Sequence, residues 1–216
     1  MIMSLEILPK ALSDWFTVLS SLGWDVDLFR TIHLSWRQPW LDVLFLLLTY
    51  TGDGHIQIPL LLAACFWKQT RSLGLAILAT YASSGIIRLL LKDIFDRPRP
   101  TNLPFADPVT WPYEAPAWFL KTFDIVPYGN SSFPSGHTTT SFAIAFTVAW
   151  WFHGTKQAWI GYIAMAWATG VALSRVYIGV HFPADVVSGA ALALVFTSLI
   201  ALIWHRNGWA PSRRLV

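Results

Sequence analysis

The charged and imidazole side chains at the ends of the apolar runs are the residues whose types and spacing could carry out a reaction. They fall in three short clusters: KDIFDRPRP at 92–100, PSGH at 134–137 and SRVYIGVHFPAD at 174–185. Together the clusters supply fixed cations, a helix start with serine and glycine, and two histidines with an aspartate. Phosphoryl transfer needs this combination, because its transition state spreads negative charge over oxygens that cations and backbone N–H groups stabilise.

Three cations and one helix start are the expected phosphate-binding groups. Lys92, Arg99 and Arg175 supply the positive charge, and an arginine can bind two phosphate oxygens at once. Ser135 and Gly136 open an apolar run, where the free N–H groups of a helix form an anion site and glycine allows a close approach. No cluster of acidic residues with metal-ligand character lies beside them, so we predict a site with neither metal nor cofactor.

The two histidines are expected to handle the covalent and proton-transfer steps. Pro183 suits the first turn of a helix, which places His181 just before that helix and Asp185 in its first turn. A carboxylate there can fix the imidazole tautomer of His181 and leave the other nitrogen free for phosphorus. His137 is then expected to be the acid for the leaving oxygen.

Two further arginines have two interpretations each. Arg88 lies inside an apolar run one turn before Lys92, at a depth where a charge indicates function. It is expected either to pair with a carboxylate or to reach a second headgroup phosphate. For Arg97, pairing with Asp93 or Asp96 is as good an interpretation as a role in the site.

Four other polar residues are expected to be structural first. Asp53 and His55, in the segment TGDGH, predict a turn, with substrate binding as the weaker alternative. His153 and His205 are expected to be ordinary membrane-interface or bundle residues.

Composition indicates an integral membrane protein. Of 216 residues, 55% are hydrophobic and 12% charged, against about 25% charged in soluble domains. The net charge is +3 and no basic run occurs, which argues against a nucleic-acid partner. The expected partners are the lipid bilayer and a lipid phosphate substrate. The single cysteine, Cys65, excludes an intrachain disulfide and gives no indication of redox compartment.

Six apolar runs predict an all-α, polytopic bundle over residues 36–205. They are Trp36–Thr51, Ile56–Trp67, Leu73–Phe95, Gly136–Phe152, Trp159–Tyr177 and Pro183–Trp204. The first two are short against the roughly 20 residues of a crossing helix, but tryptophans at their ends and the turn between them favour a spanning hairpin. Residues 96–132, rich in proline and aromatic residues, form a loop long enough to be functional.

The ends of the chain complete the expected topology. Residues 1–35 are interpreted as an interfacial amphipathic segment, and residues 206–216 as a tail. With six spans, both termini share one side with most of the loop cations, which predicts that this side is cytoplasmic and the reactive clusters are outside. Those cations are Lys68, Arg71, Lys156, Arg206, Arg213 and Arg214.

The three clusters resemble the signature of the type 2 phosphatidic acid phosphatase superfamily. That signature is K-x6-R-P, then P-S-G-H, then S-R-x5-H-x3-D, and every fixed position is present here between Lys92 and Asp185. The resemblance implies a metal-independent site at the outer face of a six-helix core. It implies that His181 forms a phosphohistidine, that Asp185 orients it, and that His137 protonates the leaving group and then activates water. The phosphate would be bound by Lys92, Arg99, Ser135, Gly136 and Arg175.

The resemblance further implies a phosphatase of the bacterial inner membrane that acts on a lipid phosphate or diphosphate. Candidate substrates are undecaprenyl diphosphate, phosphatidylglycerophosphate, phosphatidic acid and lipid A phosphates. A lipid phosphotransferase using the same histidine is the main alternative. Vanadium haloperoxidases share such a pocket but are soluble. A lipid or anion transporter is disfavoured, because the charges gather at span ends rather than at mid-membrane.

Overall fold

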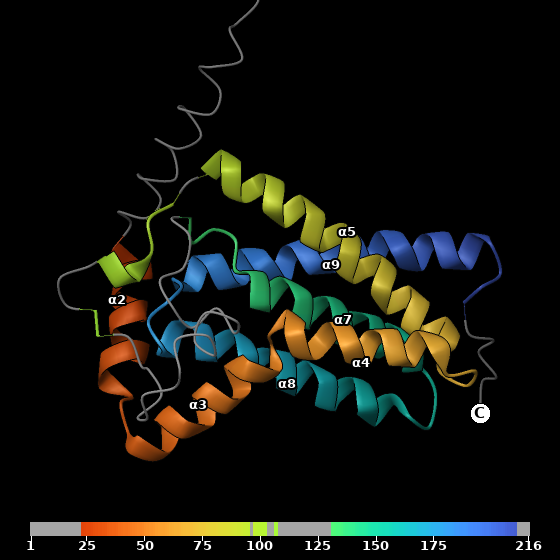
Figure 1. Cartoon of the computed structure of the whole chain (residues 1–216), viewed down its shortest axis with the longest axis horizontal. Coiled ribbons are helices and arrows are strands. Elements are labelled where there is room, and N and C mark those ends of the chain that lie inside the picture. The colour runs from red at the N-terminus through yellow and green to blue at the C-terminus, as the bar shows by residue number, and fades with distance from the viewer. Residues whose placement is uncertain (1–22, 96, 103–105, 108–130, 211–216) are drawn as a thin grey trace, which may run out of the picture.

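The structure is a computed structural model that describes residues 23–95, 97–102, 106–107 and 131–210. Within them it contains helices and no strand, so the all-α class is confirmed (Figure 1). The α-helices are α2 (Gly23–Arg30), α3 (Pro39–Thr51), α4 (Gly54–Phe66), α5 (Arg71–Phe95), α7 (Gly136–Phe152), α8 (Ala158–Tyr177) and α9 (Pro183–Arg206). A π-helical turn, η1 (Thr31–Ser35), follows α2, and a 3₁₀ turn, η2 (Pro100–Asn102), follows α5.

The bundle is built around α7, which packs against α5, α8 and α9. α5 and α9 are long and apolar enough to cross a membrane by length and composition. Their outward faces carry large apolar side chains, among them Ile86, Leu90 and Val195, each more than half exposed. An apolar surface of this kind is stable in lipid and unfavourable in water.

The first two apolar runs do not form the expected hairpin. α3 packs along α8 and α4 along α5, whereas α3 and α4 hardly touch each other. Figure 1 shows α4 leading on from α3 toward the opposite end of the bundle. Each helix has 13 residues, or about 20 Å, so the two together are long enough for the roughly 30 Å of a bilayer core. In the described residues α3 and α4 therefore follow one another along the bundle, with a break at Gly52 and Asp53, and do not double back as a hairpin.

This correction also changes the expected topology. α2 lies at the end of the bundle where α7 and α9 begin, and α9 ends at the opposite end (Figure 1). Residues 23–35 are therefore on the side of the reactive clusters and not, as predicted, on the side of Lys68 and Arg206. The two ends of the described chain therefore lie at opposite ends of the bundle.

The segment expected to lie at the membrane surface is partly buried in the protein. Asp25, Phe29 and His33 have no exposed surface. The His33 ring contacts the Tyr177 carbonyl oxygen at 2.7 Å through Nδ1, and the Phe29 ring stacks on His33. Burial lowers the pKa of His33 below its usual value. Residues 23–35 thus form part of the core beside α8 and α9, while residues 1–22 of the predicted segment lie outside the described residues.

Two glycines allow the close packing that holds the reactive clusters in place. Gly189 of α9 lies against α7, where an added Cβ would come within 2.8 Å of the Ser135 carbonyl oxygen. Gly179 has φ +87°, and a Cβ there would meet the His33 ring at 2.7 Å. Only glycine fits this turn without strain. The turn directs the amides of Val180 and His181 back to the Arg175 carbonyl oxygen, at 3.2 and 3.1 Å.

Candidate active site

The three clusters converge on one cavity of about 820 Å³ at the end of the bundle where α7 and α9 begin. Six of the eight predicted site residues line it: Lys92, Arg99, Gly136, His137, Arg175 and His181. Ser135 and Asp185 are buried just behind the wall. The other lining residues are Gly52, Asp53, Gly54, His55, Ile58, Pro59, Tyr81, Arg88 and Thr140.

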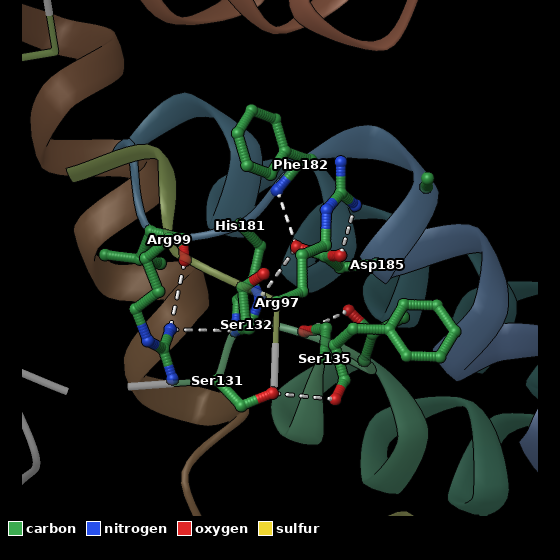
Figure 2. Close-up of polar contacts among 12 residues, drawn as sticks. Arg97, Arg99, Ser131, Ser132, Ser135, His181, Phe182 and Asp185 are labelled. Carbon is green, nitrogen blue, oxygen red and sulfur yellow. Dashed lines mark hydrogen bonds and ion pairs between the residues drawn. The ribbon is translucent and has the colours of Figure 1, made fainter. Parts of the chain in front are cut away.

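His181 is held between a carboxylate and an arginine. Its Nδ1 lies 3.5 Å from Oδ2 of Asp185, and its Nε2 lies 3.4 Å from Nη1 of Arg99 (Figure 2). Burial, and then the charges of Arg99, Arg175 and Lys92, hold the pKa of His181 well below its usual 6.5. The imidazole is therefore neutral at pH 7, as a nucleophile must be.

Asp185 belongs to a buried ion-pair network that also includes the N-terminal helix. Arg97 donates from Nη1 to Oδ1 of Asp185 at 2.6 Å and from Nη2 to Oδ2 of Asp25 at 2.5 Å. All three side chains are at most 2% exposed. The Arg97 guanidinium also lies 4.2 Å above the Phe182 ring. In the described residues Arg97 therefore pairs with acids of other elements and not, as the sequence suggests, with Asp93, and Asp96 lies outside those residues.

The remaining bonds of the two carboxylates fix the start of α9. Oδ2 of Asp185 accepts from the Phe182 amide at 2.9 Å (Figure 2), and Oδ1 of Asp25 accepts from the Ala184 amide at 2.9 Å. Negative groups are stabilised at a helix N-terminus, where the backbone N–H groups lack partners inside the helix. The network therefore sets the position of α9 and, with it, the orientation of His181.

Backbone hydrogen bonds join the three clusters to one another. The Ser132 amide donates to the Arg97 carbonyl oxygen at 2.7 Å, and the Ser135 amide donates to the Asp185 carbonyl oxygen at 3.0 Å. The two ends of the predicted loop 96–132 are thus held side by side next to α9. The aromatic cluster inside that loop lies outside the described residues.

The start of α7 faces the cavity through its backbone. The Ser135 side chain is fully buried and accepts from the Thr138 hydroxyl at 3.0 Å, so it supports the helix start and does not line the cavity. Gly136 does line it. The free N–H groups of this first turn, with the positive end of the helix dipole, can bind an anion.

The predicted cations are positioned by different elements. Arg99 donates to the Val180 carbonyl oxygen at 3.0 Å, and Arg175 donates to the Thr49 hydroxyl of α3 at 2.7 Å. Lys92 is half-buried in the last turn of α5. Three elements therefore direct positive charge into one cavity, which suits an anionic ligand with several oxygens.

Asp53 makes the predicted turn and also reaches the cavity. Its Oδ1 accepts from the His55 amide at 2.8 Å, which caps α4, and lies 2.6 Å from Nδ1 of His55. Its Oδ2 lies 3.8 Å from Nε2 of His137. A carboxylate in this position favours the protonated imidazole that an acid catalyst needs. The break between α3 and α4 thus brings a negative group to the second histidine.

The two histidines expected to be structural lie at the far end of the bundle. His153 ends α7, and the His205 ring packs edge-on against Trp150 at 5.8 Å between centroids. Across the residues that the structure describes, no group of three or more His, Cys, Asp or Glu is arranged to hold a metal ion.

Comparison with known proteins identifies the family. The model of the PAP2 superfamily matches residues 73–209, which contain all three clusters. The chain belongs to the PAP2 superfamily. The PAP2 chain described here is therefore a phosphatase and a membrane protein, as the sequence analysis predicts.

Individual PAP2 proteins are similar at modest identity. Phosphatidylglycerophosphatase B of Bacillus subtilis is 27% identical over 173 residues, which cover 76% of this chain and 75% of that protein. Undecaprenyl-diphosphatase of Sulfolobus acidocaldarius is 26% identical over 170 residues, covering 78% and 73%. The crystal structure of Aquifex aeolicus LpxE superposes with a TM-score of 0.69 at 27% identity and covers 84% of this chain and 97% of LpxE.

Proposed function

We propose that this protein hydrolyses a phosphate monoester or diphosphate of a membrane lipid, through a phosphohistidine on His181 and without a metal. The observation that carries the proposal is the single cavity in which a neutral, carboxylate-supported imidazole faces several cations and the start of α7. The similarity to phosphatidylglycerophosphatase B and undecaprenyl-diphosphatase supports a lipid as the substrate.

In the first step, Nε2 of His181 attacks phosphorus and forms an N–P bond as the P–O bond to the lipid breaks. The leaving oxygen takes a proton from His137. Asp185 accepts from Nδ1–H, which keeps the Nε2 lone pair toward phosphorus and stabilises the charge on the ring. Lys92, Arg99, Arg175 and the Gly136 amide stabilise the negative charge on the three equatorial oxygens.

In the second step, water attacks the phosphohistidine and gives a proton to His137. The N–P bond breaks, inorganic phosphate leaves, and both histidines return to their starting states. Asp53, 3.8 Å from His137, offsets part of the positive charge that the imidazole takes on when it receives the proton from water.

We propose further that the protein lies in the bacterial inner membrane with the cavity on its outer face. The end of the bundle away from the cavity carries Lys68, Arg71, Lys156 and Arg206, which the positive-inside rule assigns to the cytoplasm. At the other end, Arg97 is buried in ion pairs and Arg99 and Arg175 are directed into the cavity, whereas Arg30 and Arg37 are more exposed. Arg97, Arg99 and Arg175 are therefore not ordinary loop charges.

The test is phosphate release by purified protein across a panel of lipid phosphates in mixed micelles. The panel contains undecaprenyl diphosphate, phosphatidylglycerophosphate, phosphatidic acid and lipid A. Release from at least one member is expected, and release from none would refute the proposal. An acceptor lipid added to the same assay separates hydrolysis from phosphotransfer, because a transferase would phosphorylate the acceptor rather than release phosphate.

Replacing Asp185 with asparagine should slow turnover by up to about 10⁴-fold, as the corresponding change does in a Ser-His-Asp triad, but less completely than loss of His181 itself. Asparagine keeps the shape but cannot stabilise a charged imidazole, and it can present its NH₂ group to Nδ1. The measurement is kcat for phosphate release at saturating substrate, with thermal unfolding as the check on folding. A kcat equal to that of the wild type would contradict the role given to Asp185.

Activity should persist after dialysis against EDTA. The charge on the phosphoryl oxygens is stabilised by fixed cations of the protein, so no divalent ion has to be retained. The expected change in kcat/KM is less than twofold, and adding Mg²⁺ afterwards should not raise it. A loss of activity that Mg²⁺ restores would contradict the proposed mechanism.

A further inference from the structure

We propose that Arg88 binds a second phosphate, carried by the leaving group, and that the enzyme therefore favours lipids with two phosphates over lipids with one. The inference rests on the function proposed above and concerns the substrate class of the same cavity. The reacting phosphate would lie among Lys92, Arg99 and Arg175. The phosphate that stays on the lipid would be bound by Arg88.

Arg88 is a cation without a protein partner among the described residues. No carboxylate of the described chain lies within ion-pair distance of it, and its buried Nε has no hydrogen-bond partner. The side chain still lines the cavity. An unpaired guanidinium inside an apolar helix is unfavourable, which indicates that an anionic ligand compensates its charge.

The guanidinium also lies where the helix dipole repels it. A Cβ added to Gly136 would be 3.1 Å from Nη1 of Arg88, so Arg88 packs directly against the start of α7. A cation at a helix N-terminus is destabilised. An anion bound at this point would contact both the guanidinium and the free N–H groups of α7, and it would remove both penalties.

Arg88 is on the side of the cavity where the leaving group has to be. Its charge acts on His137 but is not among those acting on His181, whereas Arg99 shows the reverse pattern. Lys92 and Arg175 act on both histidines. The cations are therefore arranged in order: Arg99 lies beside the proposed nucleophile, Lys92 and Arg175 lie beside the reacting phosphate, and Arg88 lies beside the proposed acid. The leaving oxygen lies beside the acid, so Arg88 faces the leaving group.

The positions of Arg88 and Lys92 along α5 also place Arg88 on the side of the leaving group. Arg88 is one helical turn before Lys92, or about 6 Å further from the end of α5 that carries the reactive clusters. A lipid whose phosphate reaches that end extends its chain in the opposite direction, toward the apolar part of the bundle. A second phosphate, between the reacting one and the chain, would then lie at the level of Arg88.

The experiment compares two substrates with the same chain, farnesyl diphosphate and farnesyl monophosphate, in the wild type and in Arg88→Gln. We expect Arg88→Gln to lower the ratio of kcat/KM, diphosphate over monophosphate, at least tenfold. Arg88→Lys, which keeps the charge, should restore part of the ratio. The matched control is Lys92→Gln on the same helix face, which should lower both substrates by similar factors and leave the ratio within threefold.

A second pair of substrates locates the second phosphate. Phosphatidylglycerophosphate and phosphatidic acid test a phosphate separated from the reacting one by a glycerol. A drop in the ratio for this pair alone would assign Arg88 to a spaced phosphodiester. A drop for the farnesyl pair alone would assign it to a directly bonded diphosphate. Either result supports a second-phosphate site, and no drop for either pair overturns it.

A measurement on the wild type guards against variants that fail to fold. Methylenediphosphonate should inhibit at least tenfold more strongly than inorganic phosphate, and equal inhibition would count against the second site.

The outcomes also separate the proposed function from the proposed role of Arg88. Failure of the wild type to release phosphate from any lipid refutes the proposed function. Parallel losses within both substrate pairs in Arg88→Gln refute only the role of Arg88.

Discussion

Replacing His181 with alanine should lower kcat/KM for phosphate release at least about 10⁴-fold, to the background of the assay. Alanine removes the nitrogen to which phosphorus would bond, and water would have to attack the lipid phosphate directly. Folding should survive, so the measurement is single-turnover phosphate release, with thermal unfolding recorded in parallel.

The matched control is His205→Ala, because His205 is a histidine of α9 at the end far from the cavity. It should keep activity within about twofold of the wild type. Residual turnover above one per cent in His181→Ala, with His205→Ala normal, would show that another group is the nucleophile.

Trapping the intermediate separates the two histidines. With labelled p-nitrophenyl phosphate, whose leaving group needs no acid, wild-type protein quenched in base should carry label. His181→Ala should carry none. His137→Ala should accumulate more label than the wild type, because its second step lacks the group that activates water. Label on His181→Ala, or its absence from His137→Ala alone, would exchange the two roles.

The residues of the candidate site could be predicted from the sequence because their types are unusual for their surroundings. Charged side chains are costly in an apolar chain, so cations and histidines at the ends of apolar runs indicate a function before any fold is known. The structure brings Lys92, His137 and His181 into one cavity. Their chemical roles stay predictions until the variants are measured.

The arrangement of the first two apolar runs, which form α3 and α4, could not be predicted in the same way. Two short apolar runs separated by a polar turn fit either a hairpin or one interrupted helix, and the same residues satisfy both. The packing of α3 on α8 and of α4 on α5 decides for the interrupted helix. In this arrangement the turn brings Asp53 to 3.8 Å from His137.

The partners of Arg97 were beyond sequence reasoning for another reason. Asp93 and Asp96 are its neighbours along the chain, and local pairing is the natural expectation. Asp25 lies 72 positions away, in a segment without a motif, and only the tertiary fold brings it to Arg97. To predict this pair, one would have to know that Asp25 is buried, and a single sequence gives no indication of that burial.

Replacing Arg97 with leucine should destabilise the protein by about 3–5 kcal/mol, the usual cost of breaking a buried ion pair. Within the described residues, Arg97 is the arginine that neutralises both Asp25 and Asp185. Without it, two carboxylates face the same buried space with no opposite charge. The midpoint of thermal unfolding in micelles should fall by on the order of 10 °C.

The matched control is Arg37→Leu. Arg37 also pairs with an aspartate, Asp42, at 3.2 Å, but both side chains are about one-third exposed. An ion pair in that setting contributes about 0–1 kcal/mol, so its midpoint should move by no more than a few degrees. Equal shifts in Arg37→Leu and Arg97→Leu would mean that the buried network contributes nothing beyond a surface pair.

A double-mutant cycle tests whether the cost arises from the stranded carboxylates. Adding Asp25→Asn to Arg97→Leu removes one of the two unpaired charges, so the double variant should be more stable than the sum of the single effects predicts. Strict additivity would contradict the network.

The folded fraction of Arg97→Leu should also turn over more slowly, because Asp185 loses the hydrogen bond on Oδ1 that keeps Oδ2 toward His181. Arg37→Leu leaves that bond intact and should keep its activity.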